Sequence, residues 1–223
     1  MVIENRAIEN RAIEIGLTGG IGSGKSSVAE RLVERGAALV DADATVKQLQ
    51  RAGEPVFRAM VEHFGASIVG ADGELDRPAI AEIVFNDKDQ LDALNAIVHP
   101  AVRTSMATQR TELAATHDVV VLDIPLLVEG NKAYDDLSGV IVVDVPVAIA
   151  VERLVTHRGF AESDARARIS SQVSREKRLE AADFVVHNGA TLAELDAEVE
   201  RCWQWITGLV KENSKNLEID VNE

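Results

Sequence analysis

The sequence is poor in cysteine and has no long apolar run. Cys202 is the only cysteine among the 223 residues, so neither an internal disulfide nor a cysteine-based metal cluster is possible, and we expect a reducing, cytoplasmic setting. The longest apolar run, Val119–Val128, is interrupted by Asp123 and Pro125. It is far shorter than the ~18–20 apolar residues that span a bilayer. The first residues also lack the apolar segment of a secretory signal, so we expect a soluble protein without a membrane partner.

Basic residues are scarce relative to acidic ones. The chain has 23 Lys and Arg residues against 37 Asp and Glu residues, a formal net charge of −14. This surplus of negative charge disfavours binding to nucleic acid or to an anionic membrane, because both carry phosphate. One stretch, residues 153–178, has the opposite sign, with seven basic residues against three acidic ones. The sequence therefore favours small phosphate-bearing ligands at one local basic site, and it indicates no obligate protein partner.

Five short apolar runs alternate with helical patterns along the chain. Their continuous apolar character is typical of strands in a parallel sheet that helices cover on both faces. The predicted fold class is therefore α/β, with a five-stranded parallel sheet. The predicted strands are Ala12–Thr18, Ala38–Val40, Val119–Ile124, Val140–Val145 and Phe184–Val186.

The length and the pattern predict a single domain over residues 12–209, with an insertion and a lid. The helical insertion occupies residues 45–117, the helical lid occupies residues 151–178, and the core comprises residues 12–44, 118–150 and 179–209. Before this domain a pentapeptide, Ile3–Ala7, recurs directly, and we interpret residues 1–11 as a leader extension. We expect residues 210–223 to form a polar, frayed tail.

The strongest motif lies at Gly19–Ser26, which reads GGIGSGKS and fits the pattern GxxxxGK[ST]. Glycines let the backbone wrap around phosphate oxygens, and the helix that begins near Lys25 adds its positive dipole end. Lys25 can reach the β- and γ-phosphates, and the Ser26 hydroxyl can bind Mg²⁺ directly. Because the motif follows a strand candidate and opens an amphipathic helix, it predicts a P-loop that binds a nucleoside triphosphate with Mg²⁺.

The basic stretch favours phosphoryl transfer to a substrate over hydrolysis. Arg158 lies in His157-Arg158-Gly159, a predicted bend between two helices, from which its guanidinium could reach the γ-phosphate. A movable lid that carries this arginine would also exclude water, which a kinase needs. The other basic residues of the stretch are also consistent with a solvated helix face laced with ion pairs.

Carboxylates follow two of the predicted strands, at the edge where α/β sheets bind their ligands. Asp43 is the candidate for the group that accepts the proton of the attacking hydroxyl or orients it. Asp41 could bind Mg²⁺ through water or merely cap the following helix. Asp123 resembles the carboxylate of a Walker B strand and could also hold Mg²⁺ through water. Residues Pro125–Glu129 would form an apolar floor beside the acceptor.

Taken together, these residues resemble the dephospho-coenzyme A kinase family over about residues 13–205. The matching segments are Gly16–Ser26, Val40–Asp43, Gly73–Arg77, Leu94–Pro100, Pro125–Glu129, the stretch from Gln172 to Arg178, and Asn188-Gly189. The resemblance implies a P-loop fold in which ATP, with Mg²⁺, phosphorylates the 3′-hydroxyl of the ribose of dephospho-coenzyme A to give coenzyme A and ADP.

The resemblance also implies roles for individual residues. Lys25, Asp43 and Arg158 would be catalytic. The residues that would bind ATP are Gly20, Gly22, Ser23, Gly24, Lys25, Ser26, Ser27, Asn188 and Gly189. The residues that would bind the acceptor are Asp43, Arg77, His99, Leu126, Leu127 and Glu129. Two alternatives stay open: another P-loop kinase for a small molecule or a nucleotide, and a nucleotide-dependent switch or ATPase without an acceptor.

Overall fold

The structure is a computed structural model that describes residues 12–85, 87–129 and 136–220. The predicted leader, residues 1–11, lies outside the described residues. The chain divides into two compact units, the first formed by residues 1–40 and 112–223 and the second by residues 41–111. The second unit overlaps the predicted helical insertion, residues 45–117, but it begins four residues earlier, so that it includes Asp41 and Asp43, and it ends six residues earlier.

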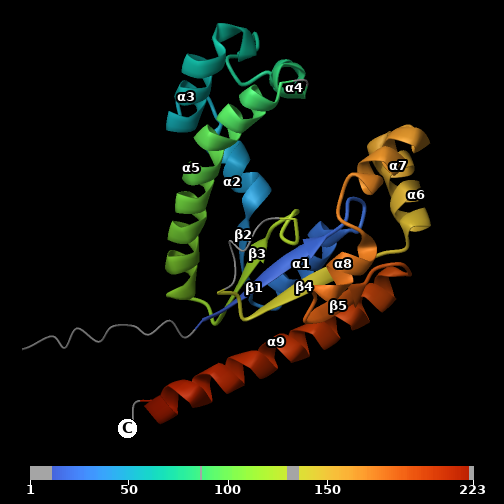
Figure 1. The fold of residues 1–223 in the computed structure, drawn as a ribbon. Helices are drawn as coiled ribbons and strands as arrows, with labels where there is room; N and C mark the ends of the chain where they lie inside the picture. Colours follow the sequence, from blue (N-terminus) through green and yellow to red (C-terminus); the bar gives the residue numbers. More distant parts are fainter. Residues whose placement is uncertain (1–11, 86, 130–135, 221–223) are drawn as a thin grey trace, which may run out of the picture. The chain divides into compact units, whose positions relative to one another are not determined.

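A five-stranded sheet forms the centre of the first unit (Figure 1). Its strand order is β2-β3-β1-β4-β5, and β1 runs parallel to both β3 and β4, as β4 does to β5. All five predicted strands are present, each within about a residue of its expected bounds. They are β1 (Ile13–Gly19), β2 (Ala38–Asp41), β3 (Val119–Asp123), β4 (Gly139–Asp144) and β5 (Phe184–His187). Since the carboxyl ends of parallel strands share one edge, the segments that follow β1, β3 and β4 emerge together.

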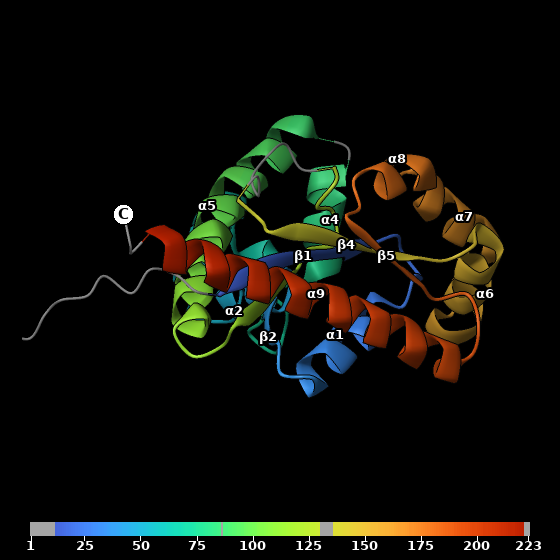
Figure 2. The ribbon, with the colours of Figure 1, turned by 90° about the horizontal axis from the view of Figure 1, so that it is seen from below.

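Two helices, α1 (Lys25–Glu34) and α9 (Leu192–Asp220), pack their apolar side chains with those of the sheet into one core. Figure 2 shows α9 running across the strands beside α1. Cys202 lies fully buried in this core, and burial raises the pKa of its thiol to about 12.

The C-terminal helix is longer than the sequence predicts. We expected a frayed tail from residue 210, but α9 continues to Asp220. Leu209 and Val210 pack against the core of the first unit, so the apolar contacts of α9 reach the start of the predicted tail. Propensity and polarity alone missed this contact, since it depends on where the sheet lies.

Three further helices follow β4 in the first unit (Figure 1). Helix α6 (Val147–Arg158) and helix α7 (Glu162–Ser170) form a hairpin around a small apolar cluster, and α8 (Arg175–Glu180) follows. The predicted bend is present, because Gly159 ends α6 with a φ of +67°, a conformation that favours glycine.

The second unit is helical and has its own core. Its elements are α2 (Ala42–Leu49), α3 (Pro55–Phe64), a 3₁₀ turn η1 (Ala66–Ile68), α4 (Arg77–Phe85) and the greater part of α5 (Lys88–Ala114). Val56, Met60, Ile68, Ile80 and Val98 form the buried centre of this core. Helix α5 runs on through Pro100, so this proline does not end it.

Within the described residues, no helix is both long enough and apolar enough to cross a bilayer.

Candidate functional site

The loop Gly19–Ser26 connects the end of β1 to the start of α1, as its sequence predicts. Gly22 and Gly24 have φ angles of +79° and +80°, which side chains rarely allow. A Cβ on Gly22 would lie 2.9 Å from the carbonyl oxygen of Ala150, and one on Gly24 would overlap Asn188 Nδ2. Both glycines are therefore required by conformation and by close packing.

The start of α1 presents backbone N–H groups at the end of this loop. The first N–H groups of a helix have no intrahelical acceptor, and the helix dipole makes this end positive. Ser26 is exposed here, while Lys25 is partly buried beside it. The arrangement is suited to binding phosphate oxygens.

Ser23 shapes the loop from inside. Its N–H donates to the carbonyl oxygen of Gly20 at 3.0 Å, closing a turn, and its side chain is only 2% exposed. The sequence groups Ser23 with the residues that would bind ATP, but its N–H is engaged within the loop. Ser23 therefore stabilises a turn of the loop, and its contact with ATP stays a prediction.

Lys25 and Asp123 form an ion pair at the carboxyl edge of the sheet. Asp123, the last residue of β3, is 6% exposed, and the side chain of Lys25 is 17% exposed. The ammonium group compensates the negative charge of a carboxylate that is nearly excluded from water. Asp123 thus lies directly beside the P-loop, as the Walker B interpretation expects.

Two side chains from outside the loop hold the carbonyl oxygen of Ser23. Asn188 Nδ2 donates to it at 2.7 Å and Arg153 Nη1 at 3.3 Å. Arg153 Nη2 also donates to the Asn188 carbonyl oxygen at 2.8 Å. Because C=O and N–H point in opposite directions in a trans peptide, these bonds direct the Gly24 N–H away from Asn188 and Arg153.

Arg153 was missed by sequence reasoning as a site residue. The only signal was its place at the start of the basic stretch, where it looks like any other surface arginine. Asn188 was predicted to contact ATP, and the structure places its side chain on the loop backbone instead of leaving it free.

Residues 125–129, the predicted apolar floor after β3, differ in how their side chains are placed. Leu126 is 52% exposed and available to a ligand. Leu127 Cδ2 lies 2.7 Å from where a Cβ on Gly16 would stand, so this leucine covers β1 at a position that only glycine leaves open. Glu129 Oε1 accepts a hydrogen bond from the Val173 N–H at 3.4 Å, and its Oε2 is buried.

Asp41, a predicted Mg²⁺ ligand or helix cap, and the remaining predicted residues of the acceptor site lie in the second unit. Asp41 caps α2, because its Oδ1 accepts from the Ala44 N–H at 2.9 Å. Asp43 is in the first turn of α2 and is exposed. Arg77, at the start of α4, and His99, within α5, are exposed as well.

Arg158 is the last residue of α6 and is exposed beside the Gly159 bend of the first unit. Its position at the end of the α6–α7 hairpin agrees with the prediction of an arginine at a bend between two helices. The hairpin therefore presents a guanidinium group at its turn.

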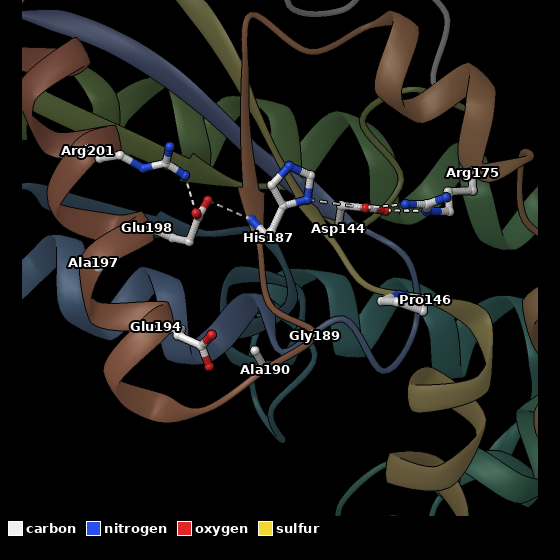
Figure 3. A pocket seen from close by; sticks show the side chains of 10 residues that line it. All are labelled: Asp144, Pro146, Arg175, His187, Gly189, Ala190, Glu194, Ala197, Glu198 and Arg201. Carbon is white, nitrogen blue, oxygen red and sulfur yellow. Dashed lines mark hydrogen bonds and ion pairs between the residues drawn. The ribbon is translucent and has the colours of Figure 1, made fainter.

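A pocket of about 540 Å³ lies where β4 and β5 end (Figure 3). Asp144, at the end of β4, is 6% exposed and forms two hydrogen bonds with Arg175, at 2.7 and 2.6 Å. His187 Nδ1 lies 3.6 Å from Asp144 Oδ2. Gly189, predicted to bind ATP, lines the same pocket. The hydrogen bonds from Arg175 and its positive charge lower the pKa of Asp144, and the same contact raises the pKa of Arg175.

This pair predicts a pH-dependent contribution to stability. The pKa of Asp144 is lower in the folded state, so the contribution is present above the ordinary carboxylate pKa and is lost as pH falls through the lowered value. We expect Arg175→Met to lower the free energy of unfolding by about 1–3 kcal/mol at pH 7, because a buried carboxylate loses its partner. The loss should shrink as pH falls below the ordinary carboxylate pKa and through the lowered pKa of Asp144.

Urea unfolding at several pH values measures this effect. Arg166→Met is the matched control, because Arg166 pairs with Glu162 on an exposed face, where both side chains are more than half exposed. Its cost should be below about 0.5 kcal/mol. A cost of Arg175→Met that stays the same when the pH is lowered from 7 to below the ordinary carboxylate pKa would contradict the role of the ion pair.

A family model described as dephospho-CoA kinase matches residues 13–194. The chain belongs to the dephospho-CoA kinase family. A dephospho-CoA kinase from Thermobifida fusca is 48% identical over 193 residues, which cover 86% of this chain and 95% of that protein. One from Streptomyces avermitilis is 47% identical over 194 residues, with 86% and 92% covered.

Solved structures support the predicted fold. A crystal structure of a Thermus thermophilus protein matches with a TM-score of 0.75 at 34% identity and covers 88% of this chain and 97% of the other. A dephospho-CoA kinase from Campylobacter jejuni matches with a TM-score of 0.61 at 24% identity, which supports the fold alone. The predicted family, the α/β P-loop fold and the ATP-dependent kinase of coenzyme A biosynthesis are confirmed.

Proposed function

We propose that this kinase transfers the γ-phosphoryl group of ATP to the 3′-hydroxyl of the ribose of dephospho-coenzyme A, in the cytoplasm. The observation that carries the proposal is the P-loop. Gly22 and Gly24 adopt left-handed conformations, the helix begins at Lys25, and Lys25 lies beside a buried carboxylate, all in a chain that belongs to this family. The products would be coenzyme A and ADP.

The P-loop side of the reaction would bind the triphosphate. Backbone N–H groups of Gly22, Gly24 and the start of α1 would hold phosphate oxygens, and Lys25 would turn its ammonium group from Asp123 to the β- and γ-phosphates. Gly20 and Ser27 flank this group, and Asn188 would act by orienting the Gly24 N–H. Arg158 would stabilise the charge that develops on the transferred group.

The residues present fit a magnesium ion. Ser26 offers a hydroxyl oxygen at the exposed start of α1, and Asp123 offers a carboxylate beside Lys25. Oxygen ligands of this kind, together with water and phosphate, are those that Mg²⁺ prefers. When bound with ATP, the ion would neutralise phosphate charge. Asp41 is engaged as a helix cap, which makes it the weaker candidate of the two aspartates.

The predicted acceptor-binding residues would hold the ribose and take the proton from its 3′-hydroxyl. Asp43 would accept the proton of the 3′-hydroxyl as the oxygen attacks the γ-phosphorus and the bond to the β-phosphate oxygen breaks. Arg77 and His99 would supply positive or hydrogen-bonding groups to the acceptor. Among the residues of the predicted apolar floor, Leu126 is exposed and could contact the acceptor. Leu127 packs on β1, and Glu129 accepts a hydrogen bond from the Val173 N–H.

An acceptor comparison tests the proposal. ADP release is measured with ATP and Mg²⁺ in the presence of dephospho-coenzyme A, adenosine, gluconate or shikimate, and without any acceptor. We expect dephospho-coenzyme A to give the fastest turnover by at least about tenfold, because a site built for several substrate groups loses binding energy with each missing one. Phosphorus NMR of the product should reveal a new 3′-phosphomonoester. Equal turnover without an acceptor would make the chain an ATPase, and faster turnover with another acceptor would make it a different kinase.

A further inference from the structure

The α6–α7 hairpin contacts the P-loop directly. The side chain of Ile21, in the middle of the loop, packs against the apolar cluster of the hairpin, whose buried members are Val151, Leu154 and Ala165. The Ile21 N–H donates to Gln172 Oε1 at 2.9 Å. Gln172 follows the end of α7 by two residues and lies 151 positions further along the chain. One residue of the loop is therefore held by both its side chain and its backbone.

The segment that carries Gln172 is itself held in place. The next residue, Val173, donates its N–H to Glu129 Oε1 at 3.4 Å, and its carbonyl oxygen accepts from Arg178 Nη1 at 2.6 Å. The Arg178 guanidinium also lies against the loop, because a Cβ on Gly20 would stand 2.8 Å from Arg178 Nη2. The backbone next to Gln172 is therefore held by two hydrogen bonds, one at the N–H and one at the carbonyl oxygen of Val173.

The hydrogen bond of Gln172 determines how one peptide group of the loop is turned. In the trans peptide between Gly20 and Ile21, the N–H and the C=O point in opposite directions. Gln172 accepts the N–H, and on the other side the Gly20 carbonyl oxygen accepts the Ser23 N–H at 3.0 Å. The turn closed by this second bond contains Gly22, whose φ is +79°.

We infer that Gln172 is a positioning residue for phosphoryl transfer, which orients the Gly20–Ile21 peptide and so holds the P-loop in its phosphate-binding conformation. The inference rests on the proposed function, in that the P-loop is taken as the ATP site. Gln172 acts through the loop and does not itself need to touch ATP. If Gln172 lacked its acceptor oxygen, the Ile21 N–H would lose this hydrogen bond, and the turn would lose one of the contacts that stabilise it.

Loss of this bond should weaken ATP binding and slow the chemical step. A displacement of about 1 Å in the reacting groups can cost about 10²-fold in rate. We expect Gln172→Met, which keeps the length but removes the acceptor, to raise the Kd of ATP and to lower kcat/KM by about 10–100-fold. The KM for dephospho-coenzyme A should change by less than about threefold, since the effect acts through the P-loop.

Two variants and a second measurement separate positioning from simple stabilisation. Gln172→Glu keeps an acceptor at the same length, so it should bind ATP more tightly than Gln172→Met does. Ser171→Ala is the matched control, because the Ser171 hydroxyl donates to Arg168 outside the loop. Hydrogen exchange of the Ile21 amide should be about tenfold faster in Gln172→Met than in Ser171→Ala, with both variants folded.

The outcomes are distinguishable. If Gln172→Met lowers only the melting temperature and leaves the Kd of ATP and the exchange of Ile21 as in the control, the inference is wrong. If Gln172→Glu is no better than Gln172→Met, the acceptor oxygen is not the operative group and the inference is also wrong. Lys25→Ala serves as the reference: wild-type turnover in that variant would overturn the proposed function of the P-loop itself.

Discussion

Lys25→Ala is expected to lower kcat/KM by about 10³-fold or more, because the ammonium group would stabilise charge on the transferred phosphoryl group. The loss should appear mainly in kcat, as expected for an interaction that strengthens in the transition state. Steady-state kinetics with ATP and dephospho-coenzyme A measure it. Wild-type turnover would contradict the assignment of Lys25.

The ion pair with Asp123 complicates this variant in a predictable way. Removing Lys25 leaves a carboxylate that is 6% exposed without its lysine, which should cost about 1–3 kcal/mol of stability. The double variant Lys25→Ala/Asp123→Asn removes both charges and should recover most of that stability. Its turnover should stay as low as that of Lys25→Ala. Recovery of stability would show that the stability lost in Lys25→Ala comes from the ion pair with Asp123.

Asp43→Asn is expected to lower kcat by about 10²–10⁴-fold, the range of general-base catalysis, while the Kd of ATP changes little. Asparagine has nearly the same shape as aspartate but cannot accept the hydroxyl proton as a carboxylate does. Single-turnover kinetics and ATP titration measure the two effects separately. A kcat close to that of the wild type would contradict a role of Asp43 in proton transfer and leave it as an exposed residue of the first turn of α2.

Asp41→Asn is the matched control for this experiment. Asp41 caps α2 through its Oδ1, and asparagine is an equally good N-cap residue. Both the stability and the kcat of Asp41→Asn should therefore stay close to those of the wild type. A loss of kcat as large as that of Asp43→Asn would assign a role in the reaction to Asp41 as well.

The sequence predicted what depends on local pattern. Continuous apolar runs identified all five strands, because a strand that is buried on both faces carries apolar side chains on both of them. The P-loop was evident because its chemistry is concentrated in eight consecutive residues, Gly19–Ser26. The bend at Gly159 was evident because glycine tolerates the left-handed conformation found there.

The support around the P-loop could not be predicted in this way. Gln172 binds Ile21 across 151 positions, and Arg153 binds Ser23 across 130. Each is a contact from one side chain to a backbone group, and any residue type can supply the backbone group. Only the folded arrangement of α6 and α7 against the loop makes these two side chains special among the polar residues of their stretch.

The thiol of Cys202 is fully buried in the core of the first unit, out of contact with solvent. Coenzyme A and its dephospho form both end in a free thiol, and mixed disulfides form when a thiolate of one partner attacks an oxidised sulfur of the other. Cys202 is the only cysteine of the chain, is fully buried, and has a pKa of about 12. Because burial raises the pKa of this thiol, the thiol form prevails at neutral pH. We therefore expect the folded kinase to resist forming a mixed disulfide with oxidised coenzyme A, because its thiol is both buried and protonated.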